Sequence, residues 1–195
     1  MALPRVGVLA LQGAVDLHVH ALARLGVSAV EVRRAEHLAE IDGLIIPGGE
    51  SSTISKLLEI NELFDPLAER LSAGMPAFGT CAGMIMLASE ILDGRDDQRC
   101  FGAIDIAVRR NAFGRQIDSF ETDLSMIGFP EAPIHAVFIR APIVDRVGSG
   151  VEILAAVEEG RPVACRQGPI LVTSFHPELS PDLRLHELFI EGMSA

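Results

Sequence analysis

Cys81 is the residue whose type and setting best suit covalent chemistry. It lies in Gly79-Thr80-Cys81-Ala82-Gly83, after an apolar run that predicts a short buried strand (75–78) and before one that predicts a helix (82–91). A cysteine between small residues at a strand-to-helix turn is the G-x-C-x-G form of a nucleophile elbow. The dipole of the following helix favours the nucleophilic thiolate. These five residues alone also fit a buried structural cysteine, because cysteine is commonly buried.

A second stretch, Phe175-His176-Pro177-Glu178, could supply a general base and its orienting partner. Side chains two apart in an extended segment point the same way, so the Glu178 carboxylate could hold one ring nitrogen of His176 while the other faces the sulfur. Cysteine, histidine and glutamate would then act as a triad. His-Pro-Glu alone also fits a turn with a helix-initiating acid. The other five histidines are predicted to be surface or packing residues. His18 and His20 would face different ways on a helix, and His37, His135 and His186 have no evident acidic orienter.

A glycine-rich loop, Pro47-Gly48-Gly49-Glu50-Ser51-Ser52-Thr53, follows a third predicted strand. Adjacent glycines free the backbone to present an N–H group to a ligand. Residues 51–53 could cap the helix that follows. Ligands of open α/β sheets bind at the carboxyl ends of the strands, so we expect this loop and the cysteine elbow on one rim. The spacing differs from a phosphate-binding loop, which disfavours a nucleotide site, and a plain tight turn is the alternative.

The elements that must position these residues alternate between strands and helices in the first half of the chain. This alternation predicts right-handed crossovers and an α/β fold of three layers, with a mostly parallel sheet covered by helices on both faces. The later predicted strands alternate poorly with helices, which favours a small antiparallel β extension. The predicted strands are 6–11, 27–32, 44–46, 75–78, 103–108, 116–124, 136–141, 151–157 and a hairpin of 161–166 with 169–174; the predicted helices are 14–25, 54–58, 63–71, 82–91 and about 182–193.

Composition limits the classes of function. The chain has 195 residues, 49% hydrophobic and 22% charged, which favours one domain over 1–195. A net charge of −11 argues against nucleic acid or an anionic membrane as partner. Three scattered cysteines, without a basic leader or a membrane-length apolar run, predict no metal site, no cofactor and a reduced, cytoplasmic setting, with Cys100 and Cys165 structural.

Taken together, these stretches resemble the class I, triad-type glutamine amidotransferases, and more closely the glutaminase subunit of the two-component pyridoxal phosphate synthase. The elbow alone identifies the superfamily, whereas the other segments are specific to this branch and run in its order. The resemblance implies a flavodoxin-like amidotransferase fold. The matching segments are 6–14 (VGVLALQGA), 47–51 (PGGES), 110–116 (RNAFGRQ), 138–142 (FIRAP) and 174–179 (SFHPEL).

The resemblance implies a role for each of these residues. Cys81 would attack the side-chain amide of L-glutamine, His176 would carry the proton to the leaving ammonia, and Glu178 would orient His176. Water would then release L-glutamate from the thioester. The backbone N–H groups of Gly48, Gly49 and Ala82 would hold the oxyanion. Substrate contacts are expected from Gly49, Glu50, Ser51, Arg110, Ile139 and Arg140.

Two features of this predicted site stay open. An arginine suits the α-carboxylate of glutamine, and we hypothesise that Glu50 meets the α-ammonium group. Without the resemblance, Arg110 and Arg140 also fit surface charges at strand ends. Gln12 could cap the first strand or face a partner protein.

The reaction itself implies a second protein. Free ammonia is protonated in water, and the chain has no phosphate loop and a single lysine, Lys56, inside a predicted helix. The resemblance names the recipient as the (β/α)8-barrel synthase subunit that forms pyridoxal phosphate, and implies that this partner activates the glutaminase. The alternatives are a glutaminase serving another synthase, such as that for imidazole glycerol phosphate, a cysteine peptidase of similar fold, and a non-catalytic binding module.

Overall fold

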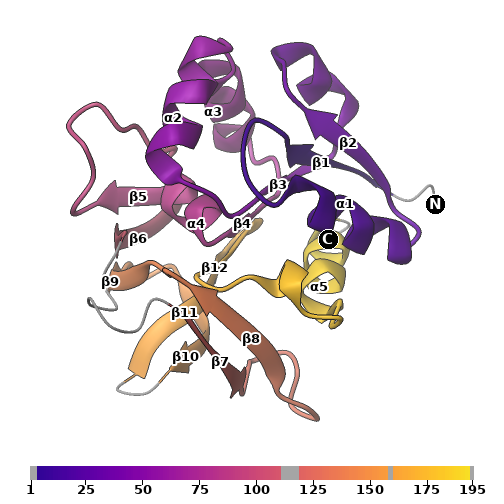
Figure 1. Cartoon of the computed structure of the whole chain (residues 1–195), viewed down its shortest axis with the longest axis vertical. Helices are drawn as coiled ribbons and strands as arrows, with labels where there is room; N and C mark the ends of the chain where they lie inside the picture. The colour runs from indigo at the N-terminus through magenta and orange to yellow at the C-terminus, as the bar shows by residue number, and fades with distance from the viewer. Residues whose placement is uncertain (1–3, 111–118, 158–159, 194–195) are drawn as a thin grey trace.

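The computed structural model describes residues 4–110, 119–157 and 160–193 (Figure 1). A seven-stranded sheet in the order β10-β11-β12-β4-β3-β1-β2 forms its centre. The strands from β12 to β2 pair in parallel, whereas β10 and β11 add an antiparallel edge. The strands are β1 (Arg5–Leu9), β2 (Ser28–Val32), β3 (Gly43–Ile46), β4 (Ala77–Thr80), β10 (Glu152–Val157), β11 (Arg161–Gln167) and β12 (Ile170–Thr173).

Helices cover both faces of this sheet (Figure 1). The apolar core on one face contains Ile54 and Leu67, from α2 and α3, together with all of α4 except its glycine. The core on the other face contains Leu22 from α1 and Phe189 from α5. The predicted α/β fold with a mostly parallel sheet is therefore confirmed. The helices are α1 (Val15–Arg24), α2 (Ser51–Ile60), α3 (Phe64–Ser72), α4 (Ala82–Leu87) and α5 (Arg184–Gly192), with short 3-10 turns η1 (Ala35–Glu40) and η3 (Pro177–Leu179).

The predicted extension consists of two small sheets. Strands β7 (Ser119–Leu124) and β8 (Ile134–Ile139) form an antiparallel hairpin. The order of the other sheet is β5 (Ala88–Ile91), β6 (Ile104–Arg109) and β9 (Ile143–Val147), and its β5–β6 pair is parallel. The extension is thus mixed in direction, and β9 was not predicted. Residues 111–118, which include most of the 110–116 motif and the start of the predicted strand 116–124, lie outside the described residues.

The predicted helix 82–91 is wrong in its second half. Helix α4 ends at Leu87, and the chain continues as strand β5. The backbone N–H groups of Phe101, Gly102 and Ala103 donate to carbonyls at the end of α4 and the start of β5. A distant segment therefore takes acceptors that a longer helix would need, and β5 pairs with β6 instead.

The cysteine elbow packs closely on the central sheet. A Cβ on Gly83 would overlap the carbonyl oxygen of Ile46, at the end of β3, and a Cβ on Gly79 would overlap the backbone of Gly83. Glycine at these two positions lets α4 lie directly against β3 and β4. This contact places the start of α4 beside the loop that follows β3. Within the described ranges, no helix is both long and apolar enough to span a membrane.

Candidate active site

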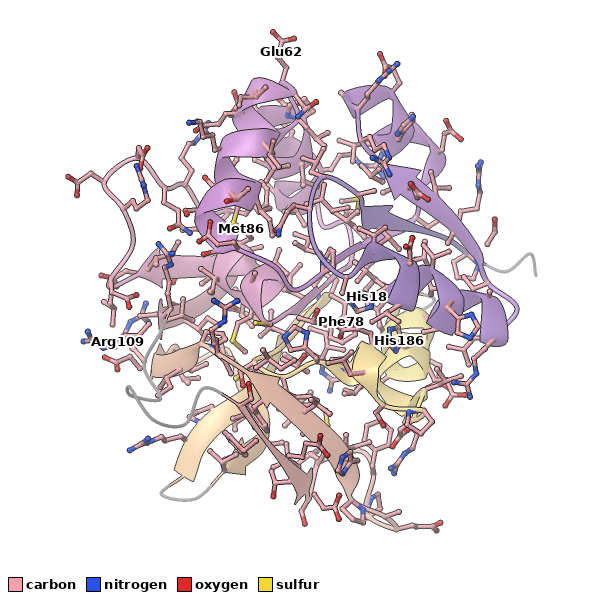
Figure 2. The ribbon with its side chains drawn as sticks, viewed as in Figure 1. His18, Glu62, Phe78, Met86, Arg109 and His186 are labelled. Atoms are coloured by element: carbon pink, nitrogen blue, oxygen red, sulfur yellow. The ribbon has the colours of Figure 1, made fainter. Side chains whose placement is uncertain are left out.

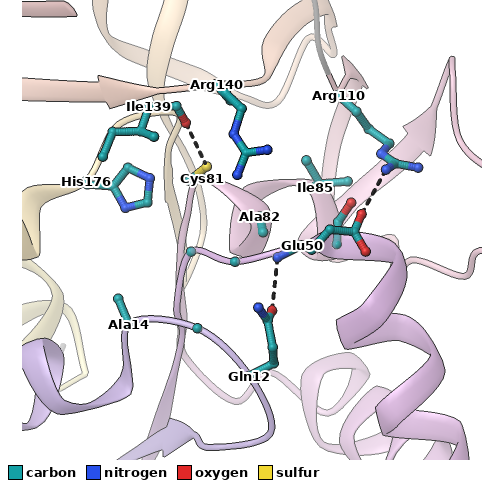
Figure 3. A pocket seen from close by; sticks show the side chains of 14 residues that line it. Gln12, Ala14, Glu50, Cys81, Ala82, Ile85, Arg110, Ile139, Arg140 and His176 are labelled. Atoms are coloured by element: carbon teal, nitrogen blue, oxygen red, sulfur yellow. Dashed lines mark hydrogen bonds and ion pairs between the residues drawn. The ribbon is translucent and has the colours of Figure 1, made fainter. Parts of the chain in front are cut away.

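A cavity of about 330 Å³ opens at the carboxyl end of the parallel strands (Figure 3). The β3–α2 loop, the cysteine elbow and the end of β8 contribute to its wall. Every residue expected to contact substrate lines it, and so do Cys81, His176 and the expected oxyanion donors. Its lining is Gln12, Gly13, Ala14, Gly48, Gly49, Glu50, Ser51, Cys81, Ala82, Ile85, Arg110, Ile139, Arg140 and His176.

Cys81 lies on a strained turn between β4 and α4. Its backbone has φ +50° and ψ −105°, a conformation that side-chain-bearing residues rarely adopt. A backbone hydrogen bond to strand β12 fixes the turn, because the Cys81 N–H donates to the carbonyl of Thr173 at 2.8 Å. The side chain is 6% exposed, and its Sγ lies 3.9 Å from the carbonyl oxygen of Ile139 (Figure 3). The geometry is that of an elbow that presents sulfur to the cavity.

His176 and Glu178 stand in the geometry that the sequence predicted. The Nδ1 of His176 lies 2.7 Å from Oε1 of Glu178, whose side chain is fully buried. The His176 backbone N–H donates to the carbonyl of Val137, which fixes the segment against β8. His176 and Cys81 line the same cavity, and a Cβ added to Gly48 would meet both of their side chains. The structure therefore brings the three predicted catalytic residues together.

Electrostatics favour a charged imidazole and a charged carboxylate. Burial disfavours the imidazolium, but hydrogen bonds to Cys81 and Glu178 and the charges of both groups raise the pKa of His176 to about 10. Burial likewise disfavours the Glu178 carboxylate, yet the His176 hydrogen bond and the nearby His18 and His176 hold its pKa below its ordinary value. His176 is thus set to hold a proton taken from the sulfur.

Glu50 has a structural role that the sequence did not predict. Its carboxylate accepts hydrogen bonds from the backbone N–H groups of Ser52 and Thr53 and so caps α2. Glu50 is therefore the capping residue, instead of 51–53 as expected, because its side chain reaches back over the first turn. Partial burial opposes ionisation, but the hydrogen bonds from Ser52 and Thr53 lower the pKa of Glu50 to about 2. The carboxylate is consequently ionised at the edge of the cavity.

Arg110 belongs to a network that ends on this carboxylate. Its Nη2 donates to Oε1 of Glu50 at 2.9 Å, and its Nη1 donates to Oε1 of Gln98 at 2.9 Å. The Nε2 of Gln98 donates in turn to Oγ of the buried Ser51 at 3.0 Å. Gln98 does not line the cavity, and no sequence signal marked it. Gln98 therefore holds two residues expected to bind substrate, Arg110 and Ser51, and Arg110 in turn bonds a third, Glu50.

The loop containing Gly48 is held from the opposite side by the β1–α1 turn. The N–H of Ala14 donates to the Gly48 carbonyl at 3.2 Å, and Oε1 of Gln12 accepts from the N–H of Glu50 at 2.9 Å (Figure 3). Gln12 thus supports the β3–α2 loop, and it also lines the cavity. Arg140, at the end of β8, has φ +44° and projects into the cavity beside Cys81 (Figure 3).

Sequence reasoning missed two polar groupings. His18 and His186, predicted as separate packing residues, are both fully buried and lie 3.0 Å apart, Nδ1 to Nε2. Their positions in the chain differ by 168 residues, so no local pattern could pair them. The statement that His135 lacks an acidic partner is wrong, because Asp123 and Glu121 lie 2.9 and 3.1 Å from its ring on the β7–β8 hairpin.

The remaining thiols differ from Cys81. Cys165 is fully buried in β11, and burial raises its pKa to about 12. Burial also raises the pKa of Cys100. Within the described ranges, no group of three or more His, Cys, Asp or Glu side chains is arranged to hold a metal ion.

The fold and this cavity define a glutamine amidotransferase, and residues 8–195 match the SNO glutamine amidotransferase family, to which the chain belongs. It is 60% identical to pyridoxal 5'-phosphate synthase subunit PdxT of Mycobacteroides abscessus over 98% of both chains. It is 58% identical to the subunit of the same name from a Parafrankia species, over 98% of this chain and 94% of the relative. A crystal structure described as a glutamine amidotransferase superposes with a TM-score of 0.91 at 49% identity, covering 97% of this chain and 99% of that one. PurLQS from Thermotoga maritima, at 14% identity and a TM-score of 0.70, has the same fold.

Replacing Gly48 with alanine is expected to slow the reaction through His176. The new Cβ would overlap Cε1 of the imidazole and would lie 3.0 Å from its Nδ1. A displacement of about 1 Å in a reacting group can cost roughly 10²-fold in rate. Measuring glutamate release by Gly48→Ala checks this, with Gly192→Ala as the matched control, because no atom lies within 4 Å of that added Cβ. A folded Gly48→Ala protein with the wild-type rate would contradict the prediction.

Proposed function

We propose that this chain is the glutaminase subunit of a pyridoxal 5'-phosphate synthase. It hydrolyses L-glutamine to L-glutamate and ammonia and delivers the ammonia to a synthase subunit. One observation carries the proposal: a cysteine on an elbow shares a cavity with an imidazole that a buried carboxylate orients, in a chain up to 60% identical to proteins named PdxT. The free thiols of this chain suit the cytoplasm, where we place the reaction.

The first half-reaction forms a thioester. Because Nδ1 of His176 faces Glu178, its Nε2 holds the proton taken from Cys81, and the sulfur attacks the amide carbon of glutamine as a thiolate. The carbonyl oxygen becomes an oxyanion, which the N–H groups of Ala82 and the Gly48-Gly49 loop would stabilise by about 3 kcal/mol per donor. His176 then returns the proton to the departing nitrogen, and ammonia leaves as the carbon–nitrogen bond breaks.

The second half-reaction regenerates the enzyme. A water molecule loses a proton to His176 and attacks the thioester carbon, passing through a second oxyanion at the same donors. The carbon–sulfur bond breaks, L-glutamate leaves, and the Cys81 thiolate is restored beside the protonated His176. Glu178 stays ionised throughout and holds the ring in one orientation.

Opposite charges at the cavity rim would hold the two ends of the amino acid. Arg140 forms no hydrogen bond to another described residue and points into the cavity, so we assign it the α-carboxylate (Figure 3). Glu50 presents a carboxylate that would meet the α-ammonium group, while Arg110 keeps it in place. Ser51, Gly49 and Ile139 complete the wall around the substrate.

Gln98→Ala is expected to weaken glutamine binding more than it slows catalysis. The change removes the hydrogen bonds that hold Arg110 and Ser51, which bind substrate and transfer no proton in this scheme. The loss of about 1 kcal/mol for each of the two hydrogen bonds predicts a KM roughly 30-fold higher, with kcat near wild type. Gln167→Ala, which removes a hydrogen bond to Asp105, serves as the control. A lower kcat at unchanged KM would refute this assignment.

The function is tested by following the amide nitrogen. The chain is mixed with a (β/α)8-barrel pyridoxal phosphate synthase subunit, a pentose phosphate, a triose phosphate and glutamine labelled with ¹⁵N in its amide. The proposal requires glutamate release and ¹⁵N in the pyridoxal phosphate. Glutamine turnover that appears only with a different synthase would assign the chain to another pathway, and cleavage of peptides without glutamine turnover would make it a peptidase.

A further inference from the structure

A second polar layer lies behind the Cys81–His176–Glu178 row, on the side away from the cavity. It consists of His18 from α1, His186 from α5 and Thr80 from the end of β4, each fully buried. Figure 2 shows His18 and His186 together in the interior where α1 and α5 meet. Because burying a polar group is costly unless it is hydrogen-bonded, three buried polar side chains in one place call for a physical reason.

The layer faces the unoccupied oxygen of the catalytic carboxylate. Oε1 of Glu178 bonds His176, whereas Oε2 is buried without a hydrogen-bond partner inside the standard distance. The nearest basic nitrogen is Nε2 of His18, at 3.5 Å. The same Nε2 lies 3.3 Å from Oγ1 of Thr80, and Nδ1 of His18 lies 3.0 Å from Nε2 of His186.

These contacts select one arrangement of protons. An ionised Glu178 accepts only, so a lone pair on His18 Nε2 would face its charge and repel it. A proton on Nε2 instead points toward Oε2 and Thr80, which leaves Nδ1 as an acceptor. His186 must then donate from its Nε2, which leaves its Nδ1 without a proton, and that atom has no partner in the described part of the chain. The donors thus run in one direction, from His186 through His18 to Glu178.

Both imidazoles are held neutral, which is consistent with donation from His186 to His18 and from His18 toward Glu178. Burial lowers the pKa of His18, with a smaller contribution from the nearby His176 and an opposing one from Glu178. Burial and the neighbouring His18 lower the pKa of His186 to about 3, again against Glu178. A neutral N–H dipole can therefore support the carboxylate without adding a full positive charge beside His176.

We propose that His18 is a positioning residue of the glutaminase, which holds Glu178 by its second oxygen while His186 fixes the His18 tautomer. The inference rests on the proposed function of Glu178 as the group that orients His176. With Oε1 bonded to His176 and the His18 N–H directed at Oε2, rotation of the carboxylate about its terminal bond is disfavoured, and the imidazole keeps its direction toward Cys81. Outer partners of this kind at metal sites are typically worth about 10- to 100-fold in affinity or activity.

Three substitutions at one position separate positioning from packing. His18→Phe keeps an aromatic ring against His186 but removes both nitrogens, and kcat is expected to fall about tenfold with KM little changed. His18→Gln places an NH2 group as many bonds from Cα as Nε2, so it should restore most of kcat. His18→Asn is one methylene shorter and should not. The measurements use the full chain with its synthase subunit, and Leu22→Ala, from the same helix and equally buried, controls for lost stability.

The pH profile supplies a readout that a packing role would not move. His18→Phe removes the N–H group that faces Oε2 of Glu178, so the Glu178 carboxylate protonates at a higher pH. The acid limb of the kcat profile therefore shifts to higher pH. The rate of Cys81 alkylation by iodoacetamide should show the same shift to higher pH. The alkylation of the other cysteines, measured in the Cys81→Ala variant, is subtracted. Wild-type kcat and profile in His18→Phe, or equal activity of the Gln and Asn variants, would overturn the inference. Absence of glutamine hydrolysis in the wild-type complex would instead refute the proposed function.

Discussion

Cys81→Ala is expected to abolish glutamate release from glutamine while leaving the chain folded. The side chain lies on a turn whose geometry is held by the backbone hydrogen bond to Thr173, and alanine keeps that hydrogen bond. Without the sulfur no thioester forms, and the loss of a covalent nucleophile of this kind costs on the order of 10⁶-fold in kcat. Glutamate release in the presence of the synthase subunit is the measurement, with circular dichroism to verify the fold.

The same variant separates hydrolysis from ammonia use. In the complex with Cys81→Ala, glutamine should no longer support pyridoxal phosphate formation, whereas an added ammonium salt should still do so. Cys100→Ala is the matched control, since it removes a thiol that is outside the cavity lining, and it should retain wild-type hydrolysis. Glutamate release that persisted in Cys81→Ala would show that another group attacks the amide.

Glu178→Gln is expected to reduce kcat severely at unchanged size and shape of the side chain. An amide can present its NH2 group to Nδ1 of His176 and so select the tautomer that cannot take the proton of Cys81. Replacing the orienting acid of a triad by its amide typically costs about 10⁴-fold. Glu187→Gln, on the exposed side of α5, makes the same chemical change without a contact to the site and should leave kcat unaltered.

The pH dependence of Glu178→Gln follows from the raised pKa of His176. In the wild type the imidazolium persists until pH approaches about 10, in part because of the hydrogen bond and charge of Glu178. Without that carboxylate the pKa of His176 falls, so the alkaline limb of residual kcat, which needs the imidazolium to protonate the leaving nitrogen, should move to lower pH. An alkaline limb that stays in place would mean that Glu178 does not control the protonation of His176.

The parts of the site that could be predicted from sequence are those made by neighbours in the chain. The cysteine elbow requires only a strand, a turn of small residues and a helix in succession. The pairing of His176 with Glu178 requires only two positions of an extended segment, and the structure has it at 2.7 Å. Alternating strands and helices likewise predict a parallel sheet, because helical crossovers allow few other arrangements.

One error arose where a distant segment competes for backbone groups, and the other where neighbouring residues could cap the same helix. Helix α4 stops at Leu87 because the N–H groups of 101–103 take its last acceptors, and its amino-acid pattern alone would continue to 91. Residues 51–53 are all good caps, but Glu50 reaches the same N–H groups and also bonds Arg110. Propensities describe a segment in isolation, so they include neither the N–H groups of 101–103 nor the hydrogen bond from Arg110 to Glu50.

The fold class, the elbow at Cys81, the local His176–Glu178 pair and the rim on which the predicted substrate residues gather follow from the amino-acid pattern alone. The side chains that support them come from distant parts of the chain: Gln98 bonds Arg110, Gln12 bonds the glycine loop, and His18 and His186 lie beside Glu178. The physical reason is one of range. Backbone geometry relates residues a few positions apart, whereas a buried hydrogen bond across 168 residues depends on how α1 and α5 pack on the finished sheet.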